Sequence, residues 1–483
     1  MRASRSWLGQ IGEDVTVTVK RWTLIAVLVA MPLLADAQAA PKADRYAALD
    51  AMLDKESREL ALPGVSMAMM EHGRIVWAGA RGWADYKKRI PATTDTVFNI
   101  ASLTKPMTAV VLMQLVEAGK LDLDTPMQRY DPSYKDPRIT VGHVLSMRSE
   151  SDPPGSGYSY NGNPYGTLDT VIRGAAGEEL GHAFSSRIIE PLGLKQTSPG
   201  SLKDPKFAKG LSAAQIAHYE ALNARLAKPT AVYGGTELVD AIPIDPEPNA
   251  AANVVSTASD YARFVDAVMR GRLLKPATLA KMWNAPVLGT GETSPYAYGW
   301  FVEEYRGHRI IYHYGYYPSA YSAVMMMVPD RDLVFVAIAN GHSVNAGNGI
   351  DPIEGHVMAC AVLVNFVDSA APCMEKAAAN VAKWRSTDQA TRPVVTSDPA
   401  VLADYAGSYR RSDGFPIKVF VKDGKLWWQS SYQPFELTQE AADRFFMKAD
   451  GRTLVFARDK SGKVIRVDIT FLFDKAVYPL PRM

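Results

Sequence analysis

The stretch 96–119 of this chain, TVFNIASLTKPMTAVVLMQLVEAG, decides how the surrounding sequence folds. Its first six residues, TVFNIA, are typical of a β-strand, and the apolar run after Ser102 predicts a long helix. Pro106 falls in the first turn of that helix, where its missing N–H costs little, and Gly119 ends the helix. The stretch therefore predicts a strand-like segment that leads directly into a helix.

The junction between the two elements carries the motif Ser102-x-x-Lys105, which occurs once in the chain. Residues three apart share one face of a helix, so the Lys105 amine can reach the Ser102 hydroxyl. The positive end of the helix also favours an anionic oxygen, which gives an activated serine nucleophile without a histidine. The motif alone fits a helix cap and a solvated lysine equally well.

Length and composition limit the other possibilities. The chain has 483 residues, of which 47% are hydrophobic and 22% are charged. These values are typical of a soluble globular protein with about two domains. The net charge of +2 is too small for a protein that binds nucleic acid through the phosphates, so we expect no nucleic-acid partner.

The N-terminal segment is typical of an export signal. Lys20-Arg21 precedes the apolar run Trp22–Ala35, and Ala37-Gln38-Ala39 fits a signal-peptidase site. The run contains Pro32 and is shorter than the about 20 residues that span a bilayer, which argues against an uncleaved anchor. We therefore expect residues 1–40 to be a signal peptide and the mature protein to be periplasmic or secreted, with no stable membrane anchor.

The sequence contains two cysteines and no pattern of a metal or cofactor site. Export would place Cys360 and Cys373 in an oxidising compartment where they can pair, although a buried free thiol at Cys360 fits the sequence as well. The eight histidines have no metal-ligand spacing, and the H-E-x-x-H and G-x-G-x-x-G motifs are absent. We expect neither a metal nor an organic cofactor.

On both sides of the stretch 96–119 the sequence predicts one α+β domain. A helix over Ala43–Leu60 precedes a β-hairpin, and residues 121–287 are mostly short helices and loops. Four β-rich stretches follow within Tyr298–Asn340, and a helix is predicted over Ile350–Val367. We expect residues 41–387 to form an antiparallel sheet flanked by helices, with a mostly helical insert.

A second, smaller domain is expected at the C-terminus. Residues 388–399 are polar and contain prolines, as in a linker. Beyond them, short strand candidates alternate with turn signals such as Asp423-Gly424 and Ser461-Gly462, a spacing typical of a small all-β sandwich or barrel. We therefore predict a small β-barrel over residues 400–483.

Two further segments contain candidate functional side chains. Tyr160 lies on a glycine-rich loop before a predicted helix, and a tyrosine beside a lysine ammonium can lose its proton below its usual pKa of about 10 and act as a proton shuttle. His313 and Gly315 lie at the end of a strand-like segment, where a glycine lets substrate approach the strand edge. Each also fits a purely structural role, aromatic packing for Tyr160 and core packing for His313.

The order of these motifs resembles the serine β-lactamase and penicillin-binding-protein superfamily, in particular its class C-like branch of esterases, D-aminopeptidases and D-Ala-D-Ala carboxypeptidases. The resemblance covers roughly residues 45–370. Further stretches occur in the order of the family: Pro137–Leu145, Pro191–Leu194, Ser256–Phe264 and Tyr298–Trp300. The resemblance implies a β-lactamase/transpeptidase-like fold. The C-terminal segment resembles, more weakly, the lipocalin-like β domain appended to many proteins of this branch.

The resemblance also implies roles for individual residues. Ser102 matches the nucleophile that accepts the acyl group, and Lys105 matches the base that activates it. Tyr160 matches the tyrosine of the family's Y-x-N motif. His313 and Gly315 match the third motif on the strand that lines the cleft. The oxyanion hole would consist of the backbone N–H groups of Ser102 and Tyr316.

Two departures from the family pattern bear on the substrate. Gly162 replaces the motif asparagine, with Asn161 and Asn163 on either side, and a family H-T-S-G becomes Met147–Glu150. We expect an exported hydrolase of a small ester, amide or peptide that works through an acyl-enzyme. The alternatives are a D-amino-acid peptidase, carboxypeptidase or weak β-lactamase of the same superfamily, and a non-catalytic homologue that binds a cell-wall or peptide ligand.

Overall fold

The computed structural model describes residues 42–59, 62–234, 236–244, 247–317, 320–341, 357–367, 379, 391–411, 414, 416–430, 434–471 and 474–483. Several predictions fall outside these residues: the signal peptide at 1–40, the first part of the helix expected over Ile350–Val367, Cys373 and the start of the linker. The predicted boundary between residues 387 and 388 is therefore not tested, and neither is a disulfide with Cys360.

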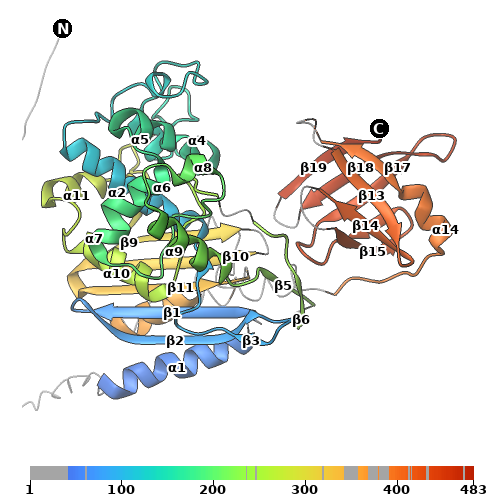
Figure 1. Ribbon diagram of the computed structural model, residues 1–483, viewed down its shortest axis with the longest axis horizontal. Coiled ribbons are helices and arrows are strands. Elements are labelled where there is room, and N and C mark those ends of the chain that lie inside the picture. Colours follow the sequence, from blue (N-terminus) through green and yellow to red (C-terminus); the bar gives the residue numbers. More distant parts are fainter. Residues whose placement is uncertain are drawn as a thin grey trace, which may run out of the picture. The chain divides into compact units, whose positions relative to one another are not determined.

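The first sheet has seven antiparallel strands in the order β3-β2-β1-β11-β10-β9-β8 (Figure 1). Their bounds are β1 Gly64–Glu71, β2 Arg74–Asp85, β3 Ile90–Pro91, β8 Phe301–Tyr305, β9 His308–Tyr317, β10 Tyr321–Val328 and β11 Leu333–Ala339. Because β1 pairs with β11, the N-terminal hairpin and the four later strands form one sheet, although the helical segment separates them in the sequence. The predicted antiparallel α+β domain is confirmed.

Helices cover both faces of this sheet, which explains why β10 and β11 are buried along their whole length. Helix α1 (Lys42–Glu59) packs on β2, and its Tyr46 stacks on Phe366, which lies just after α12 (Val357–Val362). Helix α10 (Ala258–Met269) packs on β1 and β11 from the other side (Figure 1). Cys360 is buried within α12.

The segment between the two parts of the sheet is mostly helical, as predicted. Besides α10, its α-helices are α2 Thr104–Glu117, α3 Val141–Leu145, α4 Gly162–Gly166, α5 Leu168–Ala176, α6 Leu180–Phe184, α7 Glu190–Leu192, α8 Pro205–Ala208, α9 Ala213–Ala224 and α11 Pro276–Met282. Two short antiparallel pairs accompany them: β4 (Phe98–Asn99) with β7 (Val255–Ser256), and β5 (Thr230–Tyr233) with β6 (Glu237–Asp240). Helix α2 is apolar on nearly every side because it lies in the core between the other elements.

The C-terminal strands form a second antiparallel sheet, which is nearly closed into a barrel. Its strands follow in sequence order: β12 Gly407–Arg410, β13 Pro416–Lys422, β14 Lys425–Gln429, β15 Phe435–Ala441, β16 Arg444–Phe446, β17 Thr453–Arg458, β18 Val464–Phe471 and β19 Asp474–Pro481. The predicted small β-barrel is therefore present. It has its own hydrophobic core, separate from that of the first sheet.

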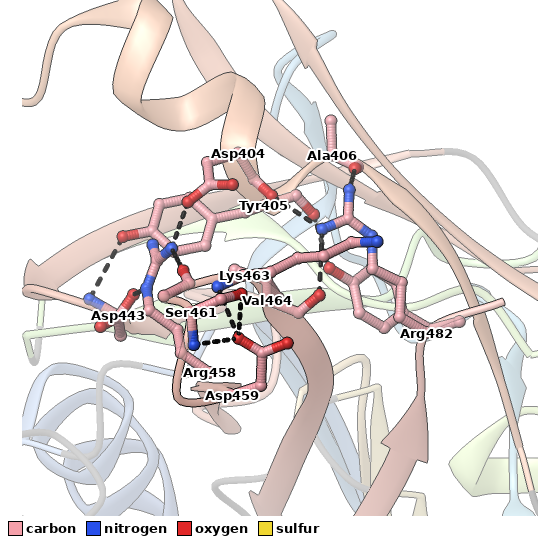
Figure 2. Close-up of polar contacts among 12 residues, drawn as sticks. Asp404, Tyr405, Ala406, Asp443, Arg458, Asp459, Ser461, Lys463, Val464 and Arg482 are labelled. Atoms are coloured by element: carbon pink, nitrogen blue, oxygen red, sulfur yellow. Dashed lines mark hydrogen bonds and ion pairs between the residues drawn. The ribbon is translucent and has the colours of Figure 1, made fainter.

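The first and last strands of the barrel meet through Arg482. Tyr409 and Arg482 form an antiparallel bridge, and the Met483 N–H donates to the Ser408 carbonyl at 2.8 Å. The Arg482 guanidinium donates to the carbonyls of Asp404 (3.0 Å) and Ala406, upstream of β12 (Figure 2). These contacts join the two edge strands, which leaves fewer unpaired backbone groups for association with other chains.

Candidate active site

Ser102 lies in a 3₁₀ turn, Ala101–Leu103, between β4 and α2. The preceding residue, Ala101, has a φ of 47°, a left-handed conformation that is strained for alanine. Its N–H donates to the Asn99 Oδ1 atom at 2.8 Å, which holds the turn in place. Ser102 is only half-buried, whereas Ala101 and Leu103 are buried. The turn therefore presents the serine hydroxyl at the surface of a rigid core.

Lys105 lies in the first turn of α2 and is buried. Its Nζ atom donates to the Ser102 Oγ atom at 2.8 Å and to the Ala251 carbonyl at 3.0 Å. The predicted contact of Ser102 with Lys105 is thus present. Burial lowers the pKa of Lys105 from its usual 10.5 to about 7. Near neutral pH the amine is therefore able to take up a proton from the serine.

Tyr160 lies directly beside this pair, on the loop before α4. The Lys105 Nζ atom is 5.1 Å from the centroid of its ring. The tyrosine hydroxyl is buried, and no residue that the structure describes lies in hydrogen-bond geometry with it. Burial raises the pKa of Tyr160 above 10, and the nearby Ser102 hydroxyl offsets part of this rise. The expectation of a Tyr160 pKa below its usual value is therefore wrong, because burial of the hydroxyl outweighs the effect of the Ser102 hydroxyl. The side chain is a neutral phenol that can donate a proton.

Glu150 holds the loop on both sides of Tyr160. Its Oε2 atom accepts from the Ser159 hydroxyl at 3.0 Å, and its Oε1 atom accepts from the Asn161 side-chain amide at 2.7 Å. The Ser159 N–H also donates to the Met147 carbonyl at 2.9 Å. The segment Met147–Glu150, which departs from the family motif, thus holds the loop that carries Tyr160 in place.

His313 lies in β9 and is fully buried. Its Nδ1 atom is 2.7 Å from the Tyr314 carbonyl and its Nε2 atom is 3.0 Å from the Tyr296 hydroxyl. Since a carbonyl only accepts, Nδ1 carries the proton and Nε2 accepts from Tyr296. Burial and the nearby Lys105 hold the pKa of His313 well below 6.5. The ring is neutral and packs 6.0 Å from that of Tyr160, between centroids.

Gly315 allows β9 to approach the serine turn closely. A Cβ atom at this position would lie 2.3 Å from the Ile100 carbonyl oxygen and 3.3 Å from the Ala101 Cβ. Only a residue without a side chain fits there, so Gly315 brings the end of β9 next to Ser102. Tyr316 follows it on the same strand, within the pairing of β9 with β10. Gly315 therefore lies against the serine turn, and Tyr316 is the next residue along β9.

Asn253 connects the segment before the serine turn with the end of β9, and no motif in the sequence marks it. It has a φ of 83°, and its Oδ1 atom accepts from the Asn99 amide at 3.2 Å and from the Tyr317 hydroxyl at 2.6 Å. Asn99 therefore links Asn253 to the strained turn at Ala101. An asparagine two residues before a tight turn is a recognisable local signal for Asn99, whereas no local pattern marks Asn253 or Glu150.

The profile of the family described as Beta-lactamase matches residues 49–354, which contain every site residue named above. The chain belongs to the Beta-lactamase family. It is a member of the β-lactamase and penicillin-binding-protein superfamily of serine hydrolases, and the predicted resemblance is confirmed. A second profile, described as a domain of unknown function (DUF3471), matches residues 391–478.

The relatives of known sequence are named for different activities. Esterase EstB of Burkholderia gladioli is 28% identical over 210 residues, which cover 34% of this chain and 53% of the esterase. This chain therefore matches about half the length of that relative. Penicillin-binding protein 4* of Bacillus subtilis (strain 168) is 23% identical over 427 residues, which cover 78% of this chain and 86% of that protein.

Solved structures share the fold at low sequence identity. The octameric penicillin-binding protein homologue from Pyrococcus abyssi superposes with a TM-score of 0.54 at 18% identity, covering 90% of this chain and 99% of that chain. The D-amino acid amidase from Ochrobactrum anthropi SV3 gives a TM-score of 0.50 at 24% identity, covering 62% of this chain and 91% of that chain. These likenesses establish the fold alone.

Among the residues that the structure describes, no three His, Cys, Asp or Glu side chains are grouped as metal ligands. None of the helices described has both the length and the apolar composition needed to cross a membrane.

Proposed function

We propose that this protein hydrolyses an ester or amide bond of a small molecule through an acyl-enzyme on Ser102. One observation carries the proposal: a buried amine, Lys105 Nζ, lies 2.8 Å from a half-buried serine hydroxyl and has its pKa lowered to about 7. A lysine with a purely structural role would keep its charge in water or pair it with a carboxylate. Here its hydrogen bonds are to the Ser102 hydroxyl and the Ala251 carbonyl.

In the first step the neutral Lys105 amine takes the Ser102 proton while Oγ forms a bond to the substrate carbonyl carbon. The carbonyl oxygen becomes an oxyanion, which the backbone N–H groups of Ser102 and Tyr316 are proposed to stabilise. When the oxyanion collapses, the bond to the leaving group breaks and the Tyr160 hydroxyl donates a proton to that group. Lys105 then returns its extra proton to Tyr160, which leaves a neutral acyl-enzyme.

Deacylation reverses these roles with water. A water molecule gives a proton to the Lys105 and Tyr160 pair as its oxygen attacks the acyl carbon, and the Ser102 oxygen leaves with a proton from the same pair. Because burial raises its pKa, the Tyr160 hydroxyl is protonated near neutral pH and carries the proton that the leaving group takes up in the proposed step. His313 is not given a proton-transfer step, because its neutral ring already donates to Tyr314 and accepts from Tyr296.

An ester is favoured over a β-lactam or a peptide on two grounds. Gly162 offers no side-chain amide to hold an amide substrate beside Lys105. The curated relatives also include an esterase, EstB. The relation to Penicillin-binding protein 4* keeps peptidase and weak β-lactamase activity as alternatives. Export to the periplasm or the medium is also proposed, on the apolar run Trp22–Ala35 alone.

The experiment compares turnover of p-nitrophenyl acetate, a D-alanyl-D-alanine peptide and the β-lactam nitrocefin by the purified protein. We expect ester hydrolysis that disappears in Ser102→Ala and in Lys105→Met, with slower or no turnover of the other two. Turnover that persists in Ser102→Ala would contradict the proposed nucleophile. No turnover of any substrate by a folded protein would favour a non-catalytic binding homologue.

A further inference from the structure

Asn253 lies in the segment that leads into β7, and the backbone of this segment is fixed against the serine turn. The Val254 carbonyl accepts from the Ile100 N–H at 3.0 Å, and the Val254 N–H donates to the Thr104 Oγ1 atom at 3.1 Å. Only 9% of Asn253 is exposed, and its φ of 83° lies in the left-handed region. The side chain of Asn253 therefore starts from a rigid position inside the core.

The orientation of two side-chain amides is determined by their backbone partners. The Asn99 Oδ1 atom accepts from the Ala101 N–H, so its amide nitrogen is the atom that donates to Asn253. The Asn253 amide nitrogen donates to the Glu247 carbonyl at 2.8 Å. The Asn253 Oδ1 atom therefore accepts two hydrogen bonds, from the Asn99 amide at 3.2 Å and from the Tyr317 hydroxyl at 2.6 Å.

The two side chains that donate to this oxygen belong to the two segments proposed to form the oxyanion hole. Tyr317 directly follows Tyr316 in β9. Asn99 holds the N–H of Ala101, the residue before Ser102. The left-handed conformation of Ala101, with a φ of 47°, orients the next peptide group, whose N–H is that of Ser102. One side-chain oxygen thus connects the two segments that carry the proposed donors.

An oxyanion hole stabilises charge only when both of its N–H groups point at the same oxygen, so the relative position of the two segments matters. Gly315 permits their close approach, and the hydrogen bonds at Asn253 add an attractive connection between them. Asn99 is fully buried and Asn253 nearly so, which strengthens these bonds relative to bonds in water. The connection is therefore suited to hold the two segments in one arrangement.

We propose that Asn253 is a positioning residue of the oxyanion hole. Its Oδ1 atom fixes the two proposed donors, the N–H groups of Ser102 and Tyr316, relative to each other. The inference rests on the proposed function, which assigns the oxyanion hole to these two groups. Because Asn253 takes no part in proton transfer, its loss should weaken the stabilisation of the oxyanion and leave the lysine base unchanged.

The test compares p-nitrophenyl acetate with p-nitrophenyl thionoacetate, in which a sulfur atom replaces the carbonyl oxygen. Sulfur is larger than oxygen and accepts hydrogen bonds more weakly, so an oxyanion hole stabilises the thiono transition state less. Release of p-nitrophenolate reports acylation by both esters, and each kcat/KM is divided by the rate constant for hydroxide-catalysed hydrolysis of the same ester. The ratio of the two corrected values, called the oxygen selectivity, cancels the fraction of active protein and the strength of the base.

Two variants break the connection in different ways. Asn253→Gly removes both hydrogen bonds, and glycine adopts a φ of 83° without strain, so the backbone is kept. Tyr317→Phe removes one hydroxyl and keeps the ring. In the wild type we expect an oxygen selectivity of at least tenfold. Asn253→Gly should lower the corrected kcat/KM at least tenfold for the oxygen ester and less than threefold for the thionoester. Tyr317→Phe should lower the selectivity about threefold and cause no further loss in the Asn253→Gly background.

Equal losses for both esters in a folded Asn253→Gly variant would mean that the residue is merely structural. That result, a wild type without oxygen selectivity, or losses that add in the double variant would overturn the inference and leave Ser102 as the nucleophile. If Asn253→Gly does not fold, Tyr317→Phe alone decides, and an unchanged selectivity overturns the inference. Absence of Ser102-dependent turnover of the oxygen ester by the wild type would instead overturn the proposed function.

Discussion

The buried amine of Lys105 should set the pH dependence of acylation. Only the neutral amine can accept the Ser102 proton, and its pKa is lowered to about 7 by burial. The neutral fraction is then about 90% at pH 8, about 9% at pH 6 and about 1% at pH 5. We therefore expect the acylation rate to fall about tenfold from pH 8 to pH 6, and about tenfold again by pH 5.

Three titratable side chains near Lys105, namely His313, Tyr160 and Tyr165, should not shift the midpoint of this profile. Burial keeps the pKa of His313 well below 6.5 and those of Tyr160 and Tyr165 above 10, so none of the three titrates near pH 7, where the midpoint is expected. The assay is the second-order rate constant for labelling of Ser102 by a fluorophosphonate, measured by stopped flow from pH 5 to pH 9. Lys105→Arg is the matched control, because a guanidinium stays protonated at every pH and should remove the labelling. A flat profile for the wild type, or a midpoint near 10, would refute the assignment of Lys105 as base.

Three further predictions concern stability and positioning. The pKa of Lys105 is about 7 in the folded protein and 10.5 in the unfolded chain. The lowered pKa therefore reduces the free energy of unfolding by roughly 5 kcal/mol below pH 7, and this loss disappears above pH 10.5, where the amine is neutral in both states. Urea unfolding should therefore show the wild type gaining stability relative to Lys105→Met between pH 7 and pH 10; a constant difference contradicts this. Glu150→Ala should lower kcat several-fold while Glu150→Gln keeps it, and Glu150→Ala should add nothing in a Tyr160→Phe background; additive losses would mean that Glu150 acts elsewhere. Gly315→Ala should destabilise the fold by about 1–3 kcal/mol and reduce turnover more than tenfold, since its Cβ would meet the Ile100 carbonyl; near-wild-type melting and turnover would argue against this close approach.

Much of the fold could be predicted because local patterns coincide with the elements. The four β-rich stretches became β8 to β11, and the apolar run after Ser102 became α2. The spacing of Ser102 and Lys105 indicated that the lysine amine can reach the serine hydroxyl, and the structure places the two atoms in contact. The spacing alone left a solvated Lys105 as an alternative, because the burial of the amine depends on the surrounding elements. Gly315 could be singled out because close backbone approach requires a residue without a side chain.

Other features depend on the surroundings of a residue, which the sequence does not display. The direction of the Tyr160 pKa shift was predicted wrongly because the burial of its hydroxyl results from packing against residues of several elements. Asn253 and Glu150 act through contacts with segments that no periodicity connects to them. Gly162 is evident as a departure in the sequence, but only the structure reveals a cavity beside it.

The most direct test of the central claim is the intact mass of the mature protein after exposure to a fluorophosphonate probe, with Ser102→Ala as control. A second sample is exposed to benzylpenicillin. We expect one probe adduct per chain in the wild type and none in Ser102→Ala, with little or no persistent penicillin adduct. A wild-type protein that is folded yet remains unlabelled, or a Ser102→Ala variant that is labelled as well as the wild type, would contradict the assignment of Ser102 as the nucleophile of a serine hydrolase.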